Sequence, residues 1–150
     1  MTRANPETLF VDTNILIEAT DVARSQHQCT RQLIEQATSW VMSAQIAREY
    51  LVVATRSPAR NGLGMQLVDA MENLVLFRKC VRMLPEEKPV LPKMLELLRE
   101  IPVTGRTIYD VNIVATMLVH GIHKLISINK EDFAPYLHKI VCFEPRSFVK

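Results

Sequence analysis

Short apolar runs alternate with amphipathic segments along the whole chain of 150 residues. A short, continuous apolar run bounded by turns is typical of a strand that is buried on both faces of a sheet. Such strands are expected at residues 8–11, 39–42, 79–84, 124–128 and 140–143. Strands that alternate with helices favour parallel pairing and a sheet that is covered on both faces. The sequence therefore predicts an α/β fold with a mostly parallel central sheet.

The intervening segments predict helices at residues 14–20, 27–38, 44–55, 65–76 and 90–99, and a final one that begins near Thr107. The final helix has the clearest pattern, a buried stripe formed by Val111, Val114, Ala115, Leu118 and Val119. Thr107 and Asp110 fit a capping box at its start, and Gly121 fits its C-terminal stop. Ser43 is a natural N-cap for the helix at 44–55.

Length and composition limit the classes of protein to consider. A chain of this length suits one domain, and no repeat or linker divides residues 1–150. The 18 Lys and Arg residues against 16 Asp and Glu residues give a net charge of +2, too small an excess to indicate nucleic-acid binding by itself. Any such binding requires basic side chains to gather on one face.

Cysteine usage and the N-terminal segment indicate a reducing compartment. Cys29, Cys80 and Cys142 lie far apart and form no CxxC motif, which argues against a disulfide framework and a structural zinc site. The first apolar run is interrupted by Asp12 and Asn14, so it fits neither a signal peptide nor a membrane span. We therefore expect a cytoplasmic protein without membrane attachment.

Acidic side chains fall where an α/β sheet binds its ligands, outside the carboxyl ends of the strands. Asp12 ends the first strand, Asp110 opens the final helix, and Asp132 follows the strand at 124–128. Glu49 lies within the helix at 44–55, with apolar residues three and four positions away, so we expect it to face inward. Each acid also fits an ordinary structural role: a cap for Asp12 and Asp110, a loop acid for Asp132, an exposed helix residue for Glu49.

Several carboxylates brought together raise each other's pKa and require a cation to stay ionised at neutral pH. Mg²⁺ or Mn²⁺ is the natural partner, because these hard ions prefer oxygen ligands and Mg²⁺ also binds substrate phosphates. A metal held in this way activates water and neutralises charge on a phosphodiester. The four acids therefore indicate metal-assisted phosphodiester hydrolysis.

Four segments, in order and spanning nearly the whole chain, resemble the motifs of PIN-domain nucleases. They are VDTNIL at 11–16, SAQIAREYL at 43–51, GRTIYD at 105–110 with IVATML at 113–118, and LISINKEDF at 125–133. The chain is most similar to VapC-type toxins of bacterial toxin–antitoxin pairs. That resemblance implies an α/β/α sandwich, a divalent metal at the acids, and endonucleolytic cleavage of RNA. It also implies a homodimer and inhibition by a cognate antitoxin, which we expect to bind a groove lined by the first helices and residues 65–76.

The resemblance also implies a role for each site residue. Asp12, Glu49 and Asp110 are expected to be the core metal ligands of the catalytic site, and Asp132 to complete the acidic cluster. Hydrogen bonds that hold these carboxylates or the substrate are expected from Thr13, Asn14, Ser127 and Asn129. Arg48 and Arg56, on or just after the helix of Glu49, are candidate phosphate contacts. Val111 departs from the family pattern, which usually has a small Ala after the third acid.

Three other functions remain to be weighed against a toxin. A PIN nuclease that processes RNA as a housekeeping enzyme fits the same acids. A PIN-like module that binds RNA or a protein partner without cutting also fits the fold, although the complete acid set argues against it. A phosphatase of the haloacid-dehalogenase type requires a DxD motif after the first strand, and Asn14 stands where its second acid is needed.

Overall fold

The computed structural model describes residues 7–148, which form a five-stranded sheet with helices on both faces. The strands are β1 (Leu9–Val11), β2 (Trp40–Met42), β3 (Val81–Met83), β4 (Lys124–Ile126) and β5 (Val141–Phe143). Their order is β3-β2-β1-β4-β5, and every neighbouring pair is parallel. The predicted α/β class is confirmed, and the sheet is wholly parallel.

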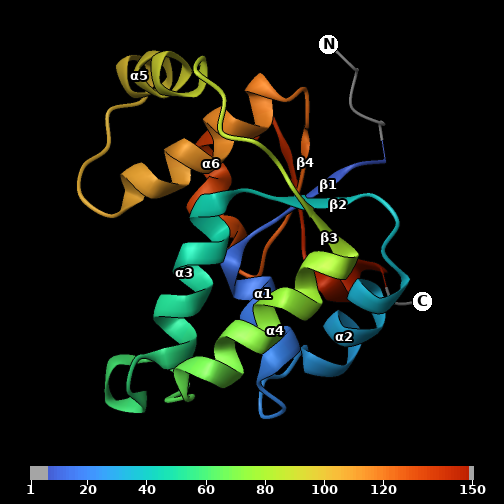
Figure 1. The fold of residues 1–150 in the computed structure, drawn as a ribbon. Coiled ribbons are helices and arrows are strands. Elements are labelled where there is room, and N and C mark those ends of the chain that lie inside the picture. Colours follow the sequence, from blue (N-terminus) through green and yellow to red (C-terminus); the bar gives the residue numbers. More distant parts are fainter. Residues whose placement is uncertain (1–6, 149–150) are drawn as a thin grey trace.

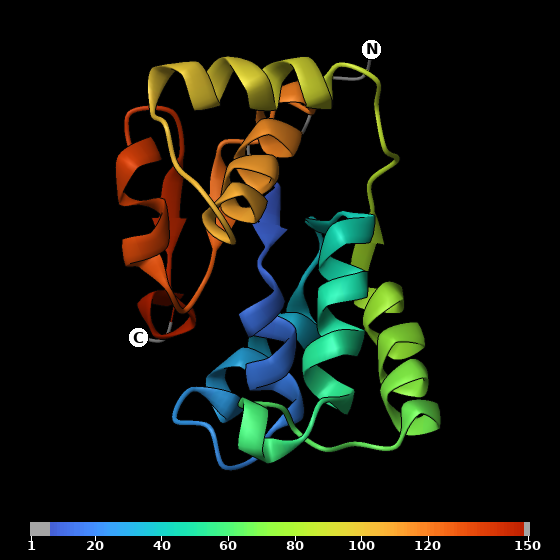
Figure 2. The ribbon, with the colours of Figure 1, turned by 90° about the vertical axis from the view of Figure 1, so that its left-hand side faces the viewer.

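Two groups of helices cover the sheet (Figures 1 and 2). The helices are α1 (Thr13–Thr20), α2 (His27–Gln36), α3 (Ala44–Thr55), α4 (Leu67–Cys80), α5 (Val90–Glu100) and α6 (Thr107–Val119), with 3-10 turns η1 (Pro58–Arg60), η2 (Lys130–Tyr136) and η3 (Pro145–Phe148). The chain moves outward from β1 to β3 and then returns to β4, so right-handed crossovers place α1–α4 on one face and α5–α6 on the other. The expected α/β/α sandwich is confirmed.

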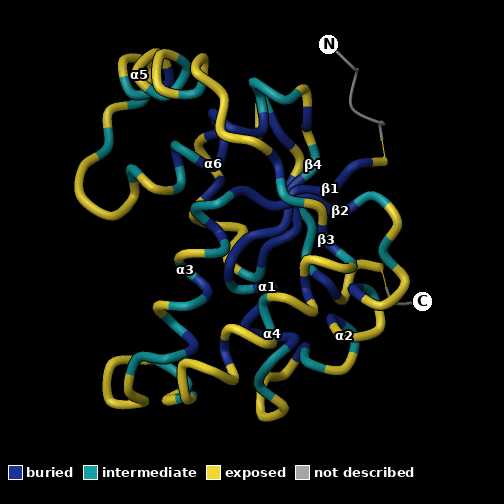
Figure 3. The backbone as a smooth tube through the Cα atoms, viewed as in Figure 1, coloured by how far each residue is buried: buried dark blue, intermediate teal, exposed yellow. Residues whose placement is uncertain are grey.

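The hydrophobic core lies along the strands and the inner face of α6 (Figure 3). Phe10 and Val11 of β1 are completely buried, as are Val111 and Val114 of α6. Burial of so much apolar surface is the main force that holds the layers together. The larger Val111 that stands in place of the usual Ala is therefore accommodated within the core. All three cysteines are free thiols.

Several element boundaries differ from those predicted. The helix predicted at 65–76 begins later and runs to Cys80, so the strand expected from residue 79 begins at Val81. Phe77 near its end packs edge-on against Tyr50, with 5.5 Å between the ring centroids, a tertiary contact that favours continuation of the helix. The helix predicted at 27–38 ends at Gln36, and the strand predicted at 124–128 ends at Ile126.

Helix caps show where local sequence rules were right and where they were wrong. Asp12 caps α1, since its Oδ1 accepts a hydrogen bond of 2.7 Å from Thr13 N. The capping box at α6 is wrong: Thr107 is the first helical residue, and its hydroxyl donates backward to Thr104 O at 2.6 Å. Ser43 occupies the N-cap position of α3 but makes no side-chain cap bond. The Asp110 carboxylate is therefore not committed to a cap.

Candidate functional site

The carboxyl ends of β1 and β4 meet where the strand order reverses, the position at which open α/β sheets bind ligands. Val11 pairs with Ile126 in the sheet, so the residues that follow, Asp12 and Ser127, are brought side by side. The Ser127 hydroxyl donates a hydrogen bond of 2.8 Å to Asp12 Oδ2. Parallel register thus joins two residues that lie far apart in the sequence.

Asn14 completes the contacts around Asp12. Its Nδ2 donates to Ser127 Oγ at 3.1 Å and to Asp12 Oδ2 at 3.3 Å, and its Oδ1 accepts a bond of 3.0 Å from Ile128 N. The backbone N–H of Asn129 also donates to Ser127 Oγ, at 3.1 Å. Beyond the end of β4, Ser127 N still donates to Phe143 O at 2.9 Å, whereas Ile128 N bonds to the Asn14 side chain. Asp12 therefore has one fixed orientation, while the Asn129 side chain is exposed at the groove.

Glu49 on α3 is half-buried and held from two sides. Thr13 Oγ1 donates to Glu49 Oε2 at 2.7 Å, and Gln45 Nε2 donates to Glu49 Oε1 at 2.9 Å. Gln45 Nε2 also donates to Tyr109 O at 3.2 Å, and Gln45 Oε1 accepts a bond of 2.5 Å from Asn112 Nδ2. Gln45 therefore joins the acid on α3 to the first turns of α6.

Gln45 and Asn112 were not among the predicted site residues, although each carries a signal in the sequence. Gln45 precedes Glu49 by four positions, which places both on one face of a helix. Asn112 is a polar residue that interrupts the most apolar helix of the chain. Their contact became visible only when α3 and α6 were placed against each other.

Asp110 and Asp132 line the same groove from α6 and η2. Asp110 is half-buried in the first turn of α6, and Asp132 is exposed in η2. Neither carboxylate has a hydrogen-bond partner within residues 7–148. Over the same residues, no group of three or more His, Cys, Asp or Glu side chains is close enough together to hold a metal ion as they stand. The four predicted acids line one groove but do not form a closed cluster.

Electrostatics at the two central acids agrees with a site for a cation. Burial raises the pKa of Asp12 to about 6; hydrogen bonds from Ser127 and Thr13 oppose this, and the carboxylates of Glu49 and Asp132 add to it. Burial likewise raises the pKa of Asp110 to about 7, and the nearby carboxylates add to it. A divalent cation relieves both causes, because it replaces water around the oxygens and cancels the repulsion. The donors present, all carboxylate oxygens, are those that Mg²⁺ or Mn²⁺ prefers.

These acids lie in a groove of about 1370 Å³ that also contains basic side chains. Figure 2 shows the end of β1 between α3 and α6, the two helices that form its walls. The basic residues that line it are Arg24, Arg48, Arg56 and Arg106. Acids at the centre and arginines around them are the arrangement expected where a phosphate chain passes a metal site.

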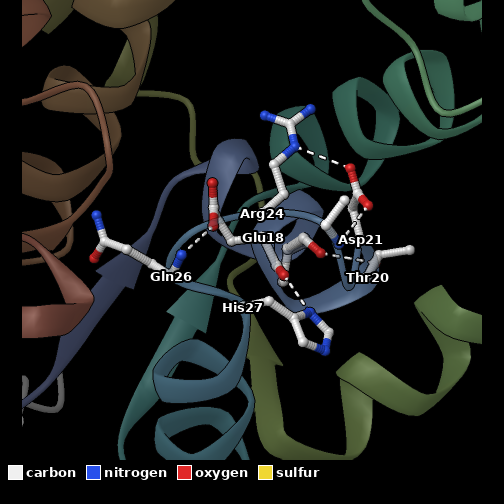
Figure 4. Close-up of polar contacts among 8 residues, drawn as sticks. Glu18, Thr20, Asp21, Arg24, Gln26 and His27 are labelled. Carbon is white, nitrogen blue, oxygen red and sulfur yellow. Dashed lines mark hydrogen bonds and ion pairs between the residues drawn. The ribbon is translucent and has the colours of Figure 1, made fainter.

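Two of these arginines form exposed ion pairs. Arg48 Nη2 lies 2.8 Å from Glu86 Oε1, so this candidate phosphate contact has an acidic partner in the free protein. Arg24 Nε lies 3.1 Å from Asp21 Oδ2 in the turn after α1 (Figure 4). The backbone N–H of Ala23 lowers the pKa of Asp21, and Arg24 contributes to the same effect. Exposed ion pairs contribute little to the free energy of folding, so a phosphate can replace either acid with a small loss of free energy.

Arg56 differs from the paired arginines because Gly62 packs over its side chain. A Cβ on Gly62 would lie 2.0 Å from Arg56 O and 2.8 Å from Arg56 Cγ. Gly64 N donates to Arg56 O at 2.9 Å, which holds the loop in place. Arg56 Nε is buried and has no hydrogen-bond partner among the described residues. The loop therefore fixes the stem of this side chain at the groove.

The turn between α1 and α2 is fixed by buried polar contacts (Figure 4). Gln26 N donates to the buried Glu18 Oε2 at 3.2 Å, and His27 Nδ1 lies 2.7 Å from Glu18 O. These contacts hold the segment that carries Asp21 and Arg24 at the groove. Within residues 7–148, no helix combines the length and apolar character needed to cross a bilayer.

Comparison with known proteins identifies the family. The PIN domain model matches residues 9–135. Solved structures with a similar fold include VapBC2 of Rickettsia felis, bound to a DNA fragment from its promoter. That structure has 13% sequence identity and a TM-score of 0.69, and the match covers 91% of this chain and 98% of that one. VapC20 of Mycobacterium tuberculosis, described as a sarcin–ricin loop cleaving toxin, has 16% identity and a TM-score of 0.65, with coverage of 86% and 95%.

A toxin–antitoxin complex from Klebsiella pneumoniae has 19% identity and a TM-score of 0.64, with coverage of 92% of this chain and 98% of that one. No curated protein matches the sequence. At these identities the solved structures establish a shared fold, and the family model covers most of the chain. The chain belongs to the PIN domain family.

Proposed function

We propose that this protein is a Mg²⁺-dependent endoribonuclease and the toxin of a toxin–antitoxin module. One observation carries the proposal: Asp12, Glu49, Asp110 and Asp132 line a single groove at the point where the strand order reverses. Membership of the PIN domain family and the likeness to VapC toxins support a nuclease. RNA is the proposed substrate because one of the similar proteins is described as cleaving the sarcin–ricin loop.

In the proposed mechanism, Asp12, Glu49 and Asp110 would hold the metal, and Asp132 would add a fourth carboxylate at the same groove. When bound, Mg²⁺ polarises a phosphodiester oxygen and lowers the pKa of a water that attacks the phosphorus. The chain's own residues prepare the ligands: Ser127 and Asn14 orient Asp12, while Thr13 and Gln45 orient Glu49. Ligands held in this way cost little reorganisation when metal and substrate arrive.

Arg48 and Arg56 are proposed to bind phosphates of the RNA on either side of the cleaved bond. Arg48 would exchange Glu86 for a phosphate oxygen, which leaves its charge balanced. Arg56 is held by its packing against Gly62, so its guanidinium needs little further ordering to bind. Contacts of this kind position the backbone without reading its sequence.

The proposal is tested by incubating the purified protein with total RNA and Mg²⁺, and then mapping the new RNA ends. Asp12→Ala and Asp110→Ala should each lower the cleavage rate by roughly 10³-fold or more, because a metal ligand is lost. Asp69→Ala, at an exposed position on α4, is the matched control and should keep full activity. Full cleavage by either active-site variant, or by the wild type in excess EDTA, would contradict the proposal.

The proposed partner is a cognate antitoxin that covers α4. The exposed apolar residues of this helix are Leu67, Val68, Met71, Val75 and Leu76. Four of them, with Glu72, line a shallow hollow of about 510 Å³. Apolar patches that stay exposed commonly mark protein–protein contacts. The groove predicted for the antitoxin was lined by the first helices and residues 65–76, and the proposed site takes up the part of it on α4, which packs against α3.

Co-expression with the product of the neighbouring gene tests this partner. The two proteins should co-purify, and Met71→Glu should release the toxin while RNA cleavage by the free protein stays unchanged. Retention of the complex by Met71→Glu would place the antitoxin elsewhere. A homodimer acting in the cytoplasm is also proposed, and sedimentation of the purified protein measures its mass.

A further inference from the structure

An exposed aromatic ring stands beside the acids. The side chain of Tyr109 is 59% exposed, although it belongs to the helix that contributes most to the core. It lines the same groove as the four acids and directly precedes Asp110 in the chain. Its ring and hydroxyl have no stacking or hydrogen-bonding partner within residues 7–148. The ring is therefore free to contact a ligand that occupies the groove.

The backbone of Tyr109 is tied to the acidic centre. Gln45 Nε2 donates to Tyr109 O at 3.2 Å and to Glu49 Oε1 at 2.9 Å, while Asn112 Nδ2 donates to Gln45 Oε1 at 2.5 Å. These bonds join α3 and α6 at the backbone of Tyr109. A shift of this backbone would therefore disturb the position of Glu49, so the point at which the ring is attached is fixed relative to Glu49.

We propose that Tyr109 stacks on one unpaired base of the RNA, next to the phosphodiester that is cleaved. The inference rests on the proposed ribonuclease function and specifies the form of its substrate. Stacking requires a base that has left the helix, because the bases of double-stranded RNA are covered by their neighbours. Tyr109 thus selects single-stranded or looped RNA, and it selects base identity only weakly because every base has a π-face.

The basic side chain next to the ring in the groove also fits the binding of an RNA strand. Arg106 lies one turn before Tyr109 on the same side of α6 and also lines the groove, where it can contact a phosphate while the ring contacts a base. A tyrosine ring has few rotatable bonds, so fixing it against a base costs little conformational entropy. This combination of aromatic and basic side chains is the one used for single-stranded nucleic acids.

The first test measures kcat/KM on a short single-stranded RNA that contains one mapped cleavage site. Tyr109→Ala should lower kcat/KM by roughly 5- to 150-fold, the measured range for loss of one stacked base, and Tyr109→Phe should keep most of it because the ring remains. Leu91→Ala is the control, since Leu91 is equally exposed at 59% but does not line the groove. Equal kcat/KM for Tyr109→Ala and the wild type would overturn the inference.

An abasic scan then locates the stacked base. Removal of the base at one position beside the cleaved bond should lower wild-type kcat/KM by about the same factor as Tyr109→Ala. At that position the variant should lose little more, because its contact is already absent. If no position shows this coupling, the inference is wrong. Loss of a dimer on mutation to Ala, measured by sedimentation, would instead assign the ring to a protein interface.

A binding measurement separates this inference from the proposed function. RNA carrying 2-aminopurine at the located position, or at each position in turn, is titrated with wild-type protein in EDTA. Stacking should quench its fluorescence with the wild type and with Tyr109→Phe, and not with Tyr109→Ala. If the wild type cleaves no RNA, ring-dependent quenching still supports the base contact while the nuclease proposal fails. Equal quenching by all three proteins would overturn the base contact even if RNA is cleaved.

Discussion

The two sides of the groove hold their acids in different ways. On the β1–β4 side, Asp12 is buried and accepts hydrogen bonds from Thr13 N, Ser127 and Asn14. On the α6–η2 side, the carboxylates of Asp110 and Asp132 have no such donors within the described part of the chain. The first side is organised before any ligand arrives, and the second is not.

The pKa values of the two central acids express the same difference. Burial is the largest cause at both positions, yet the pKa of Asp12 rises only to about 6 because Ser127 and Thr13 stabilise its ionised form. The pKa of Asp110 rises to about 7, since burial and neighbouring carboxylates act without any opposing hydrogen bond. In the proposed metal site, hydrogen bonds would hold Asp12 in place before a metal binds, whereas the charge of Asp110 would be stabilised by the metal itself.

The largest expected effect on this comparison comes from Ser127→Ala. This change removes the donor to Asp12 and leaves Asn14 Nδ2 and Asn129 N without one acceptor. Mg²⁺ affinity should fall by about 10- to 100-fold, and the free energy of unfolding by about 1–3 kcal/mol. Calorimetric titration and urea unfolding measure the two quantities. Ser147→Ala, at an exposed serine, is the control and should change neither quantity. An unchanged Mg²⁺ affinity in Ser127→Ala would show that Asp12 binds metal equally well without the hydrogen bond from Ser127.

A smaller effect is expected from Thr13→Val, which removes the hydroxyl that donates to Glu49 Oε2. Glu49 keeps its bond from Gln45, so Mg²⁺ affinity should fall by about 10-fold, the lower end of the range for such positions. Thr13→Ser keeps the hydroxyl and should bind Mg²⁺ as the wild type does. A loss of Mg²⁺ affinity in Thr13→Ser that is absent in Thr13→Val would assign the effect to packing of the methyl group, which Val keeps, rather than to the hydrogen bond.

The third expected effect is a change in stability with pH. Asp110 has a pKa of about 7 in the folded chain against 3.8 ordinarily, so between these values the folded state binds more protons than the unfolded state. The Tm of the metal-free protein should therefore fall as pH rises from about 4 to about 7. Asp110→Asn should reduce this fall and raise the Tm at pH above about 7, where the wild-type carboxylate is charged.

Thermal unfolding in EDTA measures this effect, with Asp69→Asn as an exposed control. Added Mg²⁺ should raise the Tm of the wild type above pH 7 more than that of Asp110→Asn, because the variant lacks one ligand. An equal fall of the Tm with pH in Asp110→Asn and in the wild type would contradict the raised pKa of Asp110, and with it the difference drawn between the two sides of the groove.

Sequence patterns located the strands and the helices because apolar periodicity depends only on local order along the chain. The residues at which these elements begin and end were predicted less accurately, since the end of α4 at Cys80 depends on the packing of Phe77 against Tyr50. The capping box at Thr107 failed for a similar reason: its hydroxyl had a nearer acceptor in the preceding turn, Thr104 O. Sequence rules identify the side chains that are able to form a cap hydrogen bond, and the folded backbone determines which acceptor each of them reaches.

The four acids could be singled out because strand ends and the neighbours of a helix position are visible in the sequence; they line one groove, and their role as metal ligands stays a prediction. Gln45 and Asn112 were missed because their contact joins two helices that are far apart along the chain. The same applies to Arg48, whose pairing with Glu86 depends on the path of the segment after β3.

The sequence alone was enough to predict the fold class and to select the acids as candidates, because hydrophobic burial and strand-end position act through short-range patterns. Only the tertiary structure decided that the acids are unequal. Parallel register places Ser127 against Asp12, whereas among residues 7–148 no strand or helix brings a donor to the Asp110 carboxylate. Hydrogen bonds act over a few ångströms, so the difference between the two sides arises only when distant segments are brought into contact.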